Sequence, residues 1–178
     1  MKVVRQIISI FLIIFCFKTN AQNFVGKEGI VTFFSEAPIE NIQAVNKKVG
    51  AVYNASTNEL VFSVKIKDFI FPKKLMQEHF NENYLESDIY PKSTFVGNVV
   101  ELKENGYAKV KGKLNIHGVT NSITAEGILN IDKSNVVIKA KFSVKLEDYN
   151  IDIPKIVIYN IAEVIDVDVE IQLDKYEG

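Results

Sequence analysis

Apolar and polar residues alternate with a period of two along much of this chain, and this alternation is the strongest constraint on its fold. Five runs show it clearly: residues 60–67, 108–117, 122–132, 138–147 and 165–174. Successive side chains of a β-strand point to opposite faces of a sheet, whereas a helix repeats about every 3.6 residues. Runs of this kind therefore predict long antiparallel strands with one apolar face and one polar face.

Branched aliphatic residues supply most of the apolar side of this alternation. The chain contains 21 Val and 23 Ile against 9 Leu, and β-branched side chains fit a pleated, half-buried surface better than a helix. An apolar fraction of 47% excludes a disordered chain. A formal net charge of −1 argues against a nucleic-acid partner, which would require an excess of basic residues.

The remaining segments complete an all-β pattern with one exception. Less regular alternation predicts further strands over residues 28–34, 41–45, 49–53 and 93–102. The exception is residues 73–86, where large side chains recur at three- and four-residue spacing and predict one short helix. The residues on the shared face of this helix are Leu75, Met76, His79, Phe80, Asn83 and Tyr84.

About eight long strands are more than a flat sheet of this size accommodates, so the pattern favours a closed, mainly antiparallel β-barrel. A barrel of about eight strands is just wide enough either to be filled by side chains or to hold one small ligand. The predicted inward positions include Gly112, Ala125, Gly127 and Ala140. Small residues suit a hollow interior and a tapered, packed core equally well, so both remain open at this point.

Residues 1–21 have the three-part layout of a secretory signal peptide. Two basic residues precede an apolar run over residues 7–17, and the segment ends at the small residue Ala21. We expect cleavage after Ala21, which leaves residues 22–178 as a single domain in the periplasm or outside the cell. The apolar run is too short to span a bilayer comfortably, although a retained anchor helix is the alternative. Cleavage would change the formal net charge from −1 to −4.

Two motifs resemble the YceI-like family. The first lies within residues 69–97, with FIF at 69–71 and YPKSTFVG at 90–97, and the second is GKLNIHGVT at 112–120. The resemblance implies a lipocalin-like barrel that is exported to the periplasm. It also implies that the lumen binds a long isoprenoid, such as a polyprenyl chain or the tail of an isoprenoid quinone.

The inward face of the predicted strands and one face of the helix provide the candidate binding residues. An apolar chain needs only a dry tunnel, because each Å² of apolar surface removed from water contributes roughly 25 cal/mol. The alternative interpretation of each residue is ordinary core packing. The candidate lining residues are Phe62, Val64, Ile66, Phe80, Tyr84, Leu114, Ile116, Ala125, Leu129, Phe142, Val144, Val167 and Val169.

Other chemistry has little support in the sequence. His79 and His117 are the only histidines, and without further ligands at fixed spacing we expect hydrogen bonds at turns rather than a metal site. We predict no catalytic residues and no cofactor, because the sequence shows neither a nucleophile-and-base pair nor a cofactor motif. We therefore expect a binding protein and not an enzyme.

Two alternatives to a soluble lipid carrier remain open. An outer-membrane barrel would show similar alternation, and a filled barrel would act in stress or adhesion through its surface. The sequence also leaves the oligomeric state open, a dimer included.

Overall fold

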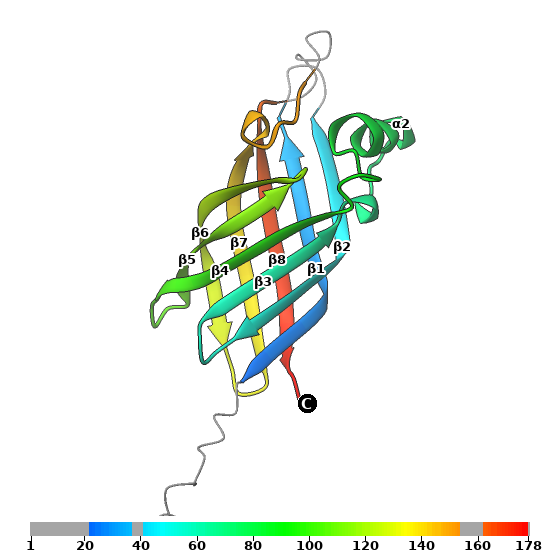
Figure 1. The fold of residues 1–178 in the computed structure, drawn as a ribbon. Coiled ribbons are helices and arrows are strands. Elements are labelled where there is room, and N and C mark those ends of the chain that lie inside the picture. The colour runs from blue at the N-terminus through cyan, green and yellow to red at the C-terminus, as the bar shows by residue number, and fades with distance from the viewer. Residues whose placement is uncertain (1–21, 37–40, 154–161, 178) are drawn as a thin grey trace, which may run out of the picture.

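The chain folds into a closed barrel of eight antiparallel strands, as a computed structural model shows (Figure 1). The structure describes residues 22–36, 41–153 and 162–177, so the signal peptide expected over residues 1–21 lies outside the described residues. Each strand pairs with its neighbours in the chain, and β8 closes the barrel on β1. The strands are β1 (Asn23–Ser35), β2 (Ile42–Asn54), β3 (Glu59–Lys65), β4 (Lys92–Leu102), β5 (Tyr107–Ile116), β6 (Val119–Ile131), β7 (Asn135–Lys145) and β8 (Val164–Lys175).

The predicted barrel is therefore confirmed, but the prediction of two separate strands at residues 41–45 and 49–53 is wrong. Both segments belong to β2, which carries a bulge between them. Opposite β1, the partner of Val31 is Asn46, whereas the partner of Gly29 is Val49. The extra residue leaves Lys47 and Lys48 both exposed and reverses which side chains point inward. This change of phase makes one strand look like two in the sequence.

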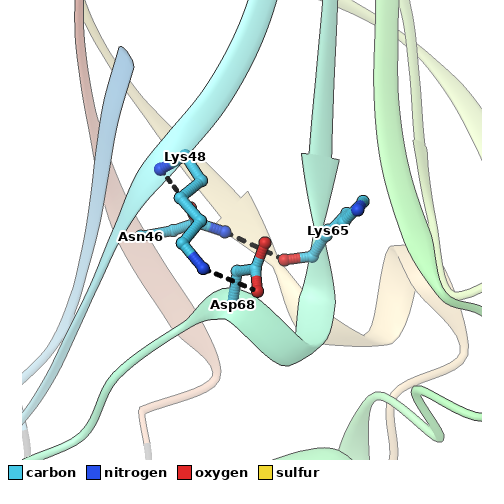
Figure 2. Close-up of polar contacts among 4 residues, drawn as sticks. All are labelled: Asn46, Lys48, Lys65 and Asp68. Atoms are coloured by element: carbon cyan, nitrogen blue, oxygen red, sulfur yellow. Dashed lines mark hydrogen bonds and ion pairs between the residues drawn. The ribbon is translucent and has the colours of Figure 1, made fainter. Parts of the chain in front are cut away.

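The bulge is held by Asn46, a polar residue that is fully buried. Its Oδ1 accepts a hydrogen bond from the backbone N–H of Lys48 at 2.8 Å, and its Nδ2 donates to the carbonyl of Lys65 at 2.9 Å (Figure 2). The Lys48 Nζ also lies 3.7 Å from Asp68 Oδ1. A buried amide costs little when both of its ends are bonded, so Asn46 fixes β2 to the end of β3.

A short helical segment lies beside one end of the barrel, at the upper right of Figure 1. It consists of α2 (Lys74–His79) followed without a break by one π-helical turn, η2 (Phe80–Tyr84), which matches the helix predicted over residues 73–86. Two single 3-10 turns, η1 (Ile66–Asp68) and η3 (Leu146–Tyr149), follow β3 and β7. Within the described ranges, no helix has the length and apolar character needed to cross a bilayer.

The end of the barrel where β1 begins and β8 ends, at the bottom of Figure 1, is filled by side chains. Phe24 stacks near Tyr53 with ring centroids 6.4 Å apart, and both are almost completely buried. We call this group the packed end. It comprises Phe24, Ala51, Tyr53, Leu60, Val99, Ala108, Leu129, Val136, Ile138, Ile171 and Leu173.

Charged pairs cover the outer face of the later strands. Lys109 lies 2.8 Å from Glu126 across β5 and β6, and lysines of β7 similarly pair with acidic residues of β8. The hydrogen bond from Lys109 lowers the pKa of Glu126. A wall facing lipid hydrocarbon would carry apolar side chains at these positions, so the outward charges disfavour the outer-membrane alternative.

Candidate functional site

The other half of the barrel, toward α2, is hollow. A cavity of about 500 Å³ lies there, within the size range of small-molecule binding pockets. The hollow and filled possibilities that the sequence left open are thus both realised, each in one half of the barrel.

All of the candidate lining residues except Leu129 border this cavity. Leu129 belongs to the packed end and is 3% exposed. Its placement in the site is wrong, because alternation tells which face a side chain occupies but not how deep it lies along the barrel. The predicted residues that border the cavity are Phe62, Val64, Ile66, Phe80, Tyr84, Leu114, Ile116, Ala125, Phe142, Val144, Val167 and Val169. Their contact with a ligand stays a prediction.

The small inward residues differ in what they do. Ala125 and Ala140 border the cavity, whereas Gly112 and Gly127 are not among the lining residues. A Cβ at Gly127 would lie 2.1 Å from the carbonyl oxygen of Lys139, so this glycine permits close approach of the backbones. Of these four small residues, the two alanines are therefore the ones that directly border the space in the lumen.

Phenylalanine side chains hold the helical segment over the cavity. The ring of Phe80, from η2, has its centroid 5.4 Å from that of Phe33, 5.6 Å from Phe69 and 4.9 Å from Phe71. All four also border the cavity. We call Phe33, Phe69, Phe71 and Phe80 the phenylalanine cluster. Offset and edge-on pairs at these distances add to the stability that burial provides.

Sequence reasoning missed three members of the phenylalanine cluster. Phe69 and Phe71 lie in a connection outside the strands, where periodicity carries no information, although the motif at 69–71 had marked them. Phe33 lies within a predicted strand of weaker alternation. The backbone of Ile70 pairs with that of Val45 in an isolated bridge, and this bridge fixes both flanking rings.

A second attachment of the helical segment runs through His117, at the turn between β5 and β6. Its Nε2 lies 2.8 Å from Glu86 Oε2 and its Nδ1 lies 3.2 Å from the carbonyl oxygen of Tyr149. The ring of Tyr90 meets the imidazole edge-on, with centroids 4.5 Å apart. Both partners are oxygen atoms that accept hydrogen bonds, so the ring links the residues that follow η2 to the end of η3. We call this arrangement the His117 latch.

The His117 latch matches the expected turn hydrogen bonds. His117 has φ of 50°, in the left-handed region that His adopts more readily than most residues. In the part of the chain that the structure describes, no group of three or more His, Cys, Asp or Glu side chains is arranged to hold a metal ion.

The cavity reaches the surface beside α2. Leu75 and His79 border it and are also exposed, which places the mouth at the helix. The Oγ of Ser35 accepts a hydrogen bond from the N–H of Ala162, and the Oγ of Ser93 donates to the carbonyl of Asn115. The hydroxyl groups of Ser35 and Ser93, which border the cavity, thus already have partners within the protein.

The described lining contains no Asp, Glu, Lys or Arg. Burial raises the pKa of the Tyr84 phenol, so this group stays neutral at physiological pH. An apolar lining of this kind suits an uncharged apolar ligand, and a charged group on such a ligand would have to remain at the mouth.

Solved structures with the same fold support this description of the barrel. A polyisoprenoid binding domain from Saccharophagus degradans, implicated in plant cell wall breakdown, superimposes with a TM-score of 0.73 at 13% identity, covering 88% of this chain and 99% of that one. BcnA of Burkholderia cenocepacia gives 0.71 at 14% identity, covering 81% and 95%. The YceI protein of Campylobacter jejuni gives 0.66 at 18% identity, covering 80% and 90%. At these identities the likeness establishes the fold.

Comparison by sequence gives one match and one negative result. The YceI-like domain matches residues 19–174, which is most of the chain. No curated protein matches the sequence significantly.

Proposed function

The chain belongs to the YceI-like family, and from this premise we propose that it is an exported lipid-binding protein. Its ligand would be a long apolar molecule of the polyisoprenoid or isoprenoid-quinone type, held in the barrel for carriage or sequestration. The solved domain from Saccharophagus degradans is described as polyisoprenoid-binding, which supports this ligand class.

The observation that carries the proposal is the apolar cavity of about 500 Å³. A protein that acted only through its surface would gain nothing from a cavity of this size, because empty space in a protein interior lowers stability. A chain of isoprene units entering it would remove apolar surface from water at roughly 25 cal/mol per Å², and that gain needs no strong polar anchor. The filled barrel that acts only through its surface therefore has less support.

Export and a binding role complete the proposal. The signal peptide expected over residues 1–21 supports export to the periplasm or the exterior. The described lining has no Asp, Glu, Lys or Arg, and its histidine, His79, lies at the exposed mouth. This composition supports binding rather than catalysis, because acid, base and nucleophilic catalysis all require a reactive group at the substrate.

Uptake of a fluorescent lipid tests the proposal. The purified protein is titrated with farnesol carrying a nitrobenzoxadiazole group, whose emission rises and shifts to the blue in an apolar environment. We expect saturable binding of one probe per chain, competed by unlabelled farnesol. A lack of saturable uptake, in a protein whose circular dichroism shows the intact barrel, would support the surface-acting alternative instead.

A further inference from the structure

We propose that the cavity has a fixed floor that limits the ligand to an apolar chain of about 15–20 carbons, or three to four isoprene units, inside the barrel. The floor residues are Leu60, Phe62, Val110 and Ile138. This inference rests on the proposed function and specifies the ligand that the same site accepts.

The floor residues are those that border the cavity and also contact the packed end. Leu60 and Ile138 border the cavity and are also members of the packed end, where they are 3% and 5% exposed. Phe62 and Val110 border the cavity and pack against the packed end from the cavity side. These side chains therefore present one surface to the ligand space and the other to a filled core.

The described side chains behind the floor are closely packed and give a ligand little room to pass. Phe24, Val136 and Leu173 have no exposed surface, and Tyr53 is 1% exposed. The Tyr53 hydroxyl also donates a hydrogen bond to Asn58 Oδ1 at 3.0 Å, which ties the packed end to the turn between β2 and β3. Protein interiors packed in this way do not open without a large loss of contacts.

The volume above the floor sets the length. A methylene group takes up roughly the same volume as a water molecule in the liquid, about 30 Å³. A cavity of about 500 Å³ then accommodates on the order of 15–20 carbon atoms. The ligand enters beside α2 with its apolar end first. The further isoprene units of a longer chain stay outside the mouth and add little to the binding affinity.

A series of prenols measures this limit directly. Geraniol, farnesol, geranylgeraniol and geranylfarnesol contain two, three, four and five isoprene units, and each is used to displace the fluorescent farnesol probe. For the unmodified protein we expect the affinity to rise about tenfold or more with each added unit that fits, and to change by less than about twofold beyond four units.

Variants of the floor and a matched control locate the limit. The double variant Leu60→Ala/Ile138→Ala removes six carbons from the floor, enough space for about one more unit, so its affinity should keep rising to geranylfarnesol. Leu129→Ala makes the same kind of truncation in the packed end, away from the cavity, and should leave the length limit unchanged. If the double variant does not fold, its two single variants and Val110→Phe, which should shorten the limit, serve in its place.

The outcomes separate the two proposals. Failure of every prenol to displace the probe would refute the proposed function, and the length limit with it. If prenols bind but affinity continues to rise beyond four units, equally in the unmodified protein and the floor variant, the proposed function stands and the floor does not set the length.

Discussion

The ring of Phe95 occupies the space that a side chain at Gly112 would need. A Cβ built on Gly112 would lie 2.6 Å from Cζ of Phe95, and also 2.5 Å from the carbonyl oxygen of Val96 on the neighbouring strand. Gly112 is paired with Gly97, which the same ring covers. The two glycines thus leave room for the end of the Phe95 ring, and Phe95 borders the cavity.

Gly112→Ala should therefore destabilise the barrel. The added methyl group has no free space and forces either the Phe95 ring or the β4 backbone to move, at a cost of about 1–3 kcal/mol in the free energy of unfolding. Urea unfolding measures this cost. Gly50→Ala is the control, since the nearest atom to its Cβ would be 3.8 Å away, and it should change stability by less than about 0.5 kcal/mol. Equal stability of the two variants would contradict the role assigned to Phe95.

Filling the cavity should abolish ligand uptake and leave the fold intact. Ala125 borders the cavity on β6, and Ala125→Phe places a ring in the ligand space, where it takes the contacts that a bound chain would make. We expect at least a tenfold loss of affinity for the fluorescent farnesol probe, with the circular dichroism unchanged. Thr124→Phe adds the same ring at the neighbouring exposed position and should bind the probe normally. Loss of binding in both variants would contradict the assignment of the binding site to the lumen.

Loosening the His117 latch should speed the exchange of ligand. His117→Asn keeps a residue that tolerates φ of 50° but is too short to reach both Glu86 and the carbonyl of Tyr149. The segment after η2 then loses one of its attachments, and the probe should dissociate about tenfold faster in a stopped-flow chase with unlabelled farnesol. Glu86→Gln retains an oxygen that accepts from Nε2 and should stay within about twofold of the unmodified rate. An unchanged rate in His117→Asn would show that this end of the barrel does not control exchange.

Alkaline pH should weaken the packed end. Burial raises the pKa of Tyr53 above its ordinary value of 10.0, so the unfolded chain loses this proton more readily than the folded one. The stability is complete below pH 10 and falls as the pH rises toward the higher pKa of the folded state. Thermal unfolding between pH 8 and about 11 measures the slope. Tyr53→Phe, which cannot ionise, should lose stability less steeply over this range, and an equal slope would argue that Tyr53 is not held in a dry core.

Much of the barrel follows from the sequence because its later strands are regular. In β5 to β8 each inward residue lies two positions from the next, and nothing interrupts the phase. In β2 the bulge at Asn46 reverses the phase, and only the pairing with β1 on both sides of the bulge reveals one continuous strand. Regular strands are predictable from local pattern, whereas a bulge depends on partners distant in the sequence.

The site is predictable only in part for a related reason. Alternation identified residues such as Ala125 that face inward, but depth along the barrel is not encoded in a period of two. Leu129 lies on the same face of β6 and falls in the packed end. The phenylalanine cluster and the His117 latch lie at the end of the barrel near α2. Their contacts join connections and turns that are distant in the sequence, so the alternation of the strands does not predict them.

The most direct test of the account is to identify what the protein contains when it is purified from the organism that naturally produces it. Native mass spectrometry of the intact chain, followed by lipid extraction, measures both the stoichiometry and the chemical class of any bound molecule. We predict one isoprenoid lipid per chain, absent from the Ala125→Phe variant prepared in the same way. A folded protein that carries no lipid, or that carries equal amounts with and without Ala125→Phe, would contradict the claim that the hollow half of the barrel is a lipid-binding site.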